Sequence, residues 1–258
     1  MGRKTEHHRL FEDEVACLQD RQDRVFMERR VPGAPKTRKA VTEFFGSAPV
    51  LFLSVVLCFS ACRPKDPSLE GGFKDRFERK LLGENYYDTI GRYRIIHGKL
   101  NIEKAYNHPL WMRKRLPRDV IIEVDVLSKS SEGDIKVEVF GDGRSHAWSR
   151  GAYRATGYVI CMGGWKNSKS FIARRDEHGK EGRDIVSRND PAAKVQINKT
   201  YHWKIVREGK LLSWYVDGEL FLTFEDPMPL FGPKNDHFGF NNWQSDVYFD
   251  NLLIRPLK

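Results

Sequence analysis

The chain has 258 residues, 12% of them aromatic, and carries a formal net charge of +9. Residues 63–258 hold 34 basic against 27 acidic residues without any basic run, so the excess suits contact with anionic surfaces or polymers. No nucleic-acid recognition motif accompanies this charge, and we expect no nucleic-acid partner.

Residues 1–43 form a polar and basic N-terminal extension that mixes both charge signs. Arg29, Arg30 and further basic residues up to Lys39 stand just before an apolar run. Met27 would start an export signal of ordinary length, so we expect residues 1–26 not to be part of the protein. The alternative is a short cytoplasmic helix in front of an uncleaved anchor.

Residues 44–62 carry no charge and end in small residues before a cysteine, which is typical of an export signal. Phe59-Ser60-Ala61-Cys62 resembles the lipobox of bacterial lipoproteins, with Phe59 in place of the usual Leu. The resemblance implies that Cys62 is acylated and becomes the first residue of the mature protein.

An uncleaved signal anchor is the alternative, because 19 uncharged residues come near the ~20 needed to cross a bilayer. Gly46 and Pro49 interrupt the run, and the remaining stretch, 50–61, suits a signal better than a membrane span. Both interpretations tether the rest of the chain to a membrane of the bacterial cell envelope, on its extracytoplasmic side.

A Pro/Ser/Gly-containing linker, 63–72, precedes a domain that we place at 73–258. Alternating apolar residues predict strands near 120–127, 135–140, 203–207, 211–216, 219–224, 237–241 and 247–254. Asp217-Gly218 and Glu208-Gly209 are hairpin signals. No sustained helical periodicity follows residue 80, so we expect an all-β, two-sheet antiparallel β-sandwich.

Three segments, 73–79, 203–218 and 247–252, look like those of bacterial concanavalin A-like lectin/glucanase domains. The resemblance covers about 73–258 and implies a jelly roll with a carbohydrate ligand on its concave sheet. That superfamily includes lectins, glucanases and domains of unknown function, so the shared fold says little about activity.

Laminarinase-like members of that superfamily carry Glu-x-Asp-x-x-Glu on one strand. Glu123 and Asp125 match the first two positions and would share one sheet face, but Ser128 replaces the last Glu. A retaining glycosidase needs two carboxyl groups ~5–5.5 Å apart. Glu138, expected on a neighbouring strand, is the candidate for a rearranged pair. The interpretation we favour is that Glu123 and Asp125 bind basic side chains or sugar hydroxyls without chemistry.

The densest cluster of unusual residues runs from Gly163 to Gly179. Its two leading glycines suit a bend at a strand end, which would expose Trp165 for stacking on a sugar ring. Candidate ligand-binding residues are Trp165, Arg174, Asp176 and His178, and His178 is also a catalytic candidate. The alternative is a charged turn held by surface ion pairs.

Asn241, Asn242 and Trp243 form a second candidate ligand group, because amides and an exposed indole suit sugar hydroxyls and apolar ring faces. Further aromatic residues either extend this platform or belong to the core: Trp148, Tyr153 and Tyr158. Hydrophobic alternation assigns Trp203 and Trp214 to the core.

Cys161 would be the lone cysteine of the mature domain, and we expect it to be buried in a strand without a disulfide or a catalytic role. Asp75 and Asp250 fall in the first and last strands, where they would suit a structural Ca²⁺. Hydrogen bonds from these two carboxylates to turn amides, without a metal ion, are an equal alternative. We expect no other cofactor.

Two functions remain open. The first is a membrane-tethered extracytoplasmic glycan-binding domain without catalysis, and the second is a lipid-anchored glycoside hydrolase or lyase. A purely structural role in the envelope is a third.

Overall fold

The computed structural model describes residues 66–90, 92–149 and 153–257. The chain divides into two compact units, Met1–Ser60 and Ala61–Lys258, and all described residues belong to the second. The expected extension, the apolar segment and the lipidation site at Cys62 therefore lie outside the described residues. Within the described part of the chain, no helix is both long and apolar enough to span a bilayer.

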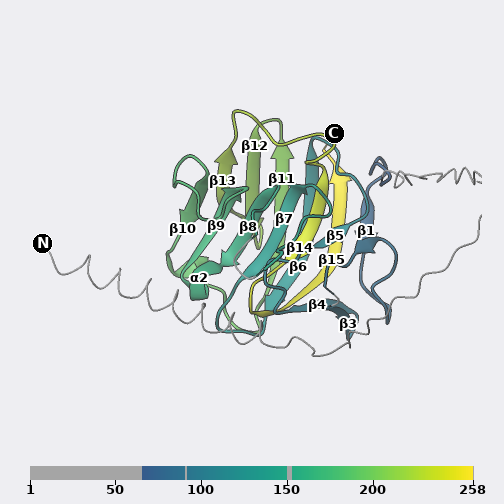
Figure 1. Cartoon of the computed structure of the whole chain (residues 1–258). Coiled ribbons are helices and arrows are strands. Elements are labelled where there is room, and N and C mark those ends of the chain that lie inside the picture. The colour runs from purple at the N-terminus through teal and green to yellow at the C-terminus, as the bar shows by residue number, and fades with distance from the viewer. Residues whose placement is uncertain (1–65, 91, 150–152, 258) are drawn as a thin grey trace, which may run out of the picture. The chain divides into compact units, whose positions relative to one another are not determined.

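Two antiparallel sheets form a sandwich, as predicted (Figure 1). The eight-stranded sheet consists, in spatial order, of β13 (Glu219–Glu225), β12 (Leu211–Val216), β11 (Thr200–Glu208), β6 (Val120–Ser128), β15 (Asp246–Pro256), β4 (Lys99–Glu103) and β3 (Tyr93–Ile96), with β1 (Phe73–Asp75) also paired to β15. The seven-stranded sheet consists of β10 (Ile185–Arg188), β9 (Lys169–Arg174), β8 (Tyr158–Gly163), β7 (Ile135–Gly141), β14 (His237–Asn241), β5 (Leu110–Met112) and β2 (Tyr86–Tyr87). Two short helices complete the described elements: α2 (Gly164–Asn167) and η1 (Pro191–Ala193).

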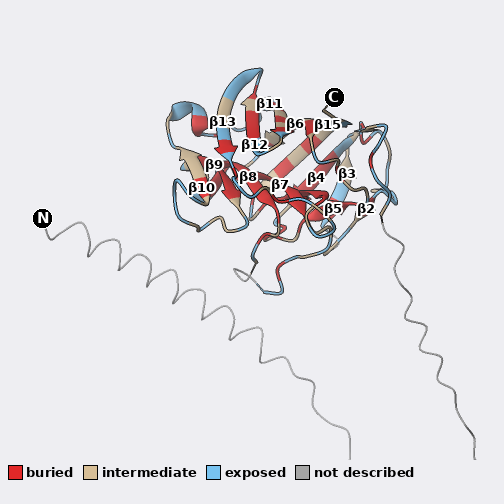
Figure 2. Ribbon diagram, turned by 90° about the horizontal axis from the view of Figure 1, so that it is seen from above, coloured by how far each residue is buried: buried red, intermediate tan, exposed pale blue. Residues whose placement is uncertain are grey.

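The core lies between the sheets and is built by alternation along the strands. On β6, Ile122, Val124 and Val126 face the core, whereas Glu123 between them is only partly buried. Trp203 and Trp214 pack edge to face at 4.7 Å in this core, as predicted. Figure 2 shows the buried residues concentrated along the facing strands.

The hairpin between β12 and β13 turns at the predicted dipeptide. Asp217 and Gly218 have φ angles of 52° and 88°, so both central residues adopt the positive φ that a type I′ turn requires. The strands therefore pair in the register Val216↔Glu219 and extend the eight-stranded sheet.

The folded domain begins earlier than predicted. Leu69, expected in the linker, is buried and belongs to the core cluster. Its amide donates to Arg115 O, and the Arg115 amide donates to Pro67 O. Residues 66–69 therefore belong to the folded domain.

Candidate functional site

The outer face of the seven-stranded sheet carries polar side chains along its middle. Ile135, Val137 and Val139 of β7 face the core, so Lys136 and Glu138 point outward. Strand pairing places Lys136 beside Asn241 on one side and Cys161 on the other. The face is polar over β7 and β14 and apolar over β8 and β9.

Two loops fold back across this outer face. The first covering loop comprises residues 142–149 and 153–157, and the second covering loop comprises residues 175–184. Glu138 fastens the first loop by accepting four hydrogen bonds: from the Tyr153 hydroxyl (2.5 Å), the Thr156 amide (2.7 Å) and hydroxyl (3.2 Å), and the Gly157 amide (2.8 Å). Burial raises the pKa of Glu138, although these donors oppose the shift. Glu138 is therefore a buried attachment point for the loop.

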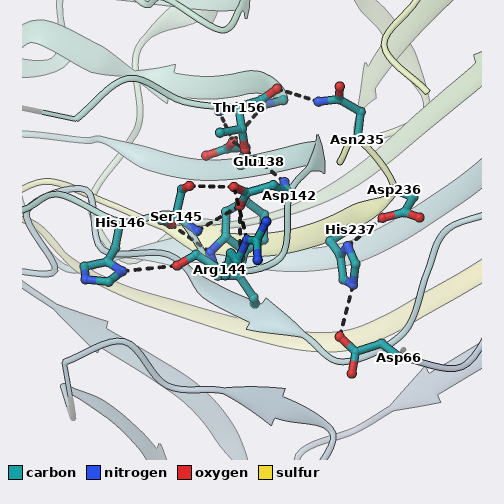
Figure 3. A network of polar contacts seen from close by, with 12 residues as sticks. Asp66, Glu138, Asp142, Arg144, Ser145, His146, Thr156, Asn235, Asp236 and His237 are labelled. Carbon is teal, nitrogen blue, oxygen red and sulfur yellow. Dashed lines mark hydrogen bonds and ion pairs between the residues drawn. The ribbon is translucent and has the colours of Figure 1, made fainter. Parts of the chain in front are cut away.

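The first part of that loop is ordered by Asp142 and docks on the segment before β5. Asp142 accepts from the amides of Arg144 and Ser145 (3.0 and 2.8 Å), as Figure 3 shows together with the Glu138–Thr156 contact. The His146 ring stacks on His108 at 5.6 Å. Docking leaves the next aromatic residue, Trp148, 84% exposed.

A buried cation, Lys136, lies at the centre of this outer face. Lys136 Nζ lies 3.0 Å from Asn107 Oδ1, 3.0 Å from Glu177 Oε2 and 3.6 Å from Asp134 Oδ1. We call these four residues the polar centre: Asn107, Asp134, Lys136 and Glu177. It joins β7 to the segment before β5 and to the second covering loop.

The pKa values of the two carboxyl groups of the polar centre are shifted in opposite directions. Burial raises the pKa of Asp134, although Lys136 opposes the shift. Burial also works against ionisation of Glu177, but the Lys136 charge and hydrogen bond outweigh it and the pKa is lowered. Burial lowers the pKa of Lys136, yet the two carboxylates outweigh it and raise the pKa, so the lysine is a cation.

Aromatic side chains surround the polar centre. We call them the aromatic rim: Tyr106, Trp165, His178 and Trp243. Tyr106 and His178 are next to Asn107 and Glu177 in the sequence. Trp243 packs perpendicular to Tyr106 at 5.1 Å and its amide donates to Asp134. Trp165 meets the His178 ring at 5.7 Å and remains 40% exposed.

A left-handed turn presents Trp165. Trp165, Lys166 and Asn167 have φ angles of 47°, 57° and 58°, a conformation that costs roughly 1–2 kcal/mol for each non-glycine residue. Asn167 stabilises the turn by accepting from Val195 N (2.7 Å) and donating to Val195 O (2.8 Å). Such strain concentrates at functional sites, which supports a role for the exposed indole.

Two predicted ligand residues of this region have structural contacts instead. Arg174 points between the sheets, where its Nε donates to Asp226 Oδ2 at 2.7 Å. Asp176 accepts from the His178 amide at 2.9 Å and shapes the turn. Of the predicted cluster, the structure brings Trp165 and His178 to the site, and it adds Glu177.

The second predicted group is only partly available. Asn242 is fully buried, and its side chain bonds the backbone of Ala105, Ile102 and Ser245, so it holds the loops together. Asn241 lies beside Lys136 on the outer face, with its Oδ1 accepting from the Asn242 amide at 2.9 Å. Trp243 belongs to the aromatic rim.

Glu123 and Asp125 do share a sheet face, as predicted, but it is the outer face of the eight-stranded sheet. His202 lies between them, 3.5 Å from Glu123 Oε2 and 2.8 Å from Asp125 Oδ1. Asn251 donates to Asp125 at 2.8 Å. Because β6 and β7 belong to different sheets, Glu138 cannot pair with either carboxylate. That expectation was wrong.

The proposed calcium ligands are separated as well. Asp75 lies opposite the core residue Leu252 and binds Arg79 through both oxygens, at 2.6 and 2.9 Å. Asp250 pairs with Lys99 at 2.6 Å beside the outer-face residue Asp125. Within the described ranges, no three His, Cys, Asp or Glu side chains gather in a way that would hold a metal ion.

The structure also places Tyr153, Tyr158 and Cys161. Tyr158 is a core residue whose hydroxyl donates to Asp226 (2.7 Å), and Tyr153 binds Glu138. Cys161 is fully buried as expected, and burial raises the pKa of its thiol. It therefore lacks the thiolate character of a nucleophile.

The residues that sequence reasoning missed are Asn107, Asp134 and Lys136. A lysine between Ile135 and Val137 is what an ordinary solvent-facing strand position looks like. Its burial arises only because the second covering loop folds over it, and no local signal shows that.

Comparison with known proteins supports the fold. A family model described as "Domain of unknown function (DUF6250)" matches residues 143–252. No curated protein matches the chain. The structure is similar to a Bacillus subtilis protein of unknown function with a galectin-like fold, at 10% identity, a TM-score of 0.51, and coverage of 71% of this chain and 94% of that one.

Two further solved structures are similar. One, described under endo-acting O-glycanases of human gut bacteria that initiate mucin breakdown, has 14% identity, a TM-score of 0.50, and coverage of 72% of this chain and 99% of that one. The other, carbohydrate binding module CBM66 of Bacillus subtilis, has 18% identity, a TM-score of 0.43, and coverage of 74% and 99%. At these identities the likeness concerns the galectin-like, jelly-roll fold.

Proposed function

We propose that this protein is a membrane-tethered, extracytoplasmic glycan-binding domain that does not catalyse a reaction. Its ligand would occupy the polar centre and the aromatic rim on the outer face of the seven-stranded sheet. The observation that carries the proposal is the pair of indoles, Trp165 and Trp243, held partly exposed on either side of a buried polar cluster.

The chemistry of the site fits a saccharide. Indole faces stack on the apolar face of a sugar ring, while amide and carboxylate groups bind its hydroxyls. Glu177, which is partly exposed, supplies such a group beside the rim, and the buried Asn107 lies next to it. The similarity to a structure described under O-glycanases is consistent with a carbohydrate ligand. The tether rests on the lipobox-like sequence ending at Cys62.

A glycan array probed with residues 61–258 tests this proposal. Trp165→Ala and Trp243→Ala should each weaken binding to the glycans found by about tenfold, which corresponds to about 1.4 kcal/mol. Tyr248→Ala is the matched control, because Tyr248 is a partly exposed aromatic residue on the other sheet. Equal loss in all three variants, or no glycan bound at all, would contradict the proposal.

A glycoside hydrolase or lyase is the second candidate, and the opposite pKa shifts of Asp134 and Glu177 favour it. Paired carboxyl groups with separated pKa values are the usual basis of acid and base roles, and both lie within 3.6 Å of Lys136 Nζ. Incubating the bound glycans with the protein and measuring reducing ends and unsaturated products distinguishes the two. Turnover that is abolished by Glu177→Gln and retained in Glu123→Gln would establish the enzyme.

A further inference from the structure

The chain enters the folded domain at one end of the sandwich. Arg115 Nε donates to Asp66 O at 2.8 Å, and His237 Nε2 lies 3.2 Å from Asp66 Oδ2. With the Leu69–Arg115 backbone bond, these contacts hold residues 66–69 against the loop between β5 and β6. Only three residues separate Asp66 from Cys62 in the sequence.

That same end is basic and apolar. The β5–β6 loop and the loop between β13 and β14 adjoin, because the Leu116 amide donates to Asp236 O at 2.6 Å. Arg118 lies 5.9 Å from the centre of the Phe231 ring, and Phe231 is 51% exposed. Met228, on the same loop, is 74% exposed.

We call this surface the basic–apolar end, and it comprises Arg113, Lys114, Arg118, Met228, Phe231 and Lys234. Among the described residues, none of its four cations forms an ion pair with a carboxylate. Two of the cations instead lie near aromatic rings, Arg113 at 6.0 Å from Tyr87 and Lys114 at 5.7 Å from Phe73. Unpaired cations beside exposed apolar side chains match the interface of an anionic membrane, where headgroups meet acyl chains.

We propose that the basic–apolar end lies on anionic phospholipid headgroups. The proposal rests in part on the tether of the proposed function, because a three-residue connection from Cys62 leaves the domain only about 14 Å of reach from its anchor. The surface that meets the membrane must then be the one where the chain enters, and that surface carries these four cations.

The proposal also assigns an orientation to the glycan site. The basic–apolar end lies where β5 ends and β14 begins, whereas Trp165 follows β8 and Trp243 follows β14 at the opposite end of the strands. Figure 1 shows α2, which holds Trp165, and the C-terminus at opposite ends of the sheets. A domain seated on its basic–apolar end presents the aromatic rim away from the membrane.

Vesicle flotation with residues 61–258, which form a compact unit containing the whole described core, tests the inference without the anchor. The probes are vesicles of phosphatidylglycerol and phosphatidylcholine, and vesicles of phosphatidylcholine alone. The test variant combines Arg113→Glu, Lys114→Glu and Arg118→Glu. The matched control combines Lys129→Glu, Lys194→Glu and Lys199→Glu, which make the same charge change on exposed residues at the opposite end.

We expect the wild type to float with the anionic vesicles only. Each basic residue near such a surface contributes about fivefold to binding, so the test variant should lose well over tenfold while the control retains most binding. Phe231→Ser, which leaves the charge unchanged, should also weaken binding.

Three results would each overturn the inference. They are equal losses in the two triple variants, no binding to anionic vesicles, and release of the protein from the vesicles by heparin added at the same total negative charge. Circular dichroism checks that the variants fold. Glycan binding measured on the test variant separates the two proposals, since it should be unchanged if the glycan site is at the other end.

Discussion

Glu138 is a fully buried carboxylate that accepts four hydrogen bonds from the first covering loop. A charge in such a place is costly unless it is well bonded, and here burial still prevails and raises the pKa. Glu177 shows the opposite balance, because its contact with Lys136 lowers the pKa despite burial. The pKa values of these two glutamates on the outer face are therefore shifted in opposite directions.

This difference predicts opposite pH dependences of stability. Because the pKa of Glu138 is higher in the folded state, the folded state binds its proton more tightly, and the contribution of Glu138 falls as pH rises above about 4.5. The contribution of Glu177 is present above about 4.5 and is lost as pH falls below it. Urea unfolding of wild type, Glu138→Gln and Glu177→Gln from pH 3 to 8 measures both differences. Differences that change with pH in the same direction would contradict the assignment.

At the scale of strands, two glycines let an indole lie flat on the outer face of the seven-stranded sheet. A Cβ on Gly141 would come within 2.2 Å of Trp111 Cη2, and one on Gly239 within 2.8 Å of its Cε3. Trp111 is fully buried there and donates its Nε1 hydrogen to Ser145 O at 2.9 Å. The indole therefore links β5 to the first covering loop.

We expect Gly141→Ala to lower the free energy of unfolding by about 1–3 kcal/mol, because the methyl group displaces Trp111. Gly71→Ala is the control, since nothing lies within 4 Å of a Cβ at that position. Chemical denaturation measures both. A Gly141→Ala variant as stable as Gly71→Ala would show that the indole moves without cost.

The strands themselves were predictable, and their assignment to sheets was not. Alternation on β6 and the Asp217-Gly218 turn act locally, so the sandwich and its hairpin could be predicted. Alternation does not say that the chain crosses to the other sheet between β6 and β7, and the expected pairing of Glu138 with Glu123 failed for that reason. Arg174 was misplaced because it is the last residue of β9, and its side chain points between the sheets to Asp226.

In the molecule as a whole, the two ends of the strands carry two different kinds of surface. One end holds the docked residues 66–69 and the basic–apolar end, and the other holds the left-handed turn of α2 and the aromatic rim. Trp165 and Trp243 could be predicted as exposed candidates from their Gly-Gly and Asn-Asn neighbours. The polar centre between them could not, because it assembles from separate segments of the chain.

The most direct test of the account is to map the glycan on the protein by amide chemical shifts. Isotopically labelled residues 61–258 are titrated with the glycan that binds best on the array. The largest shifts are predicted at residues 104–108, 134–136, 164–168, 177–178 and 241–243. Shifts centred instead on Glu123, Asp125 and His202 of the eight-stranded sheet would contradict the assignment of the site.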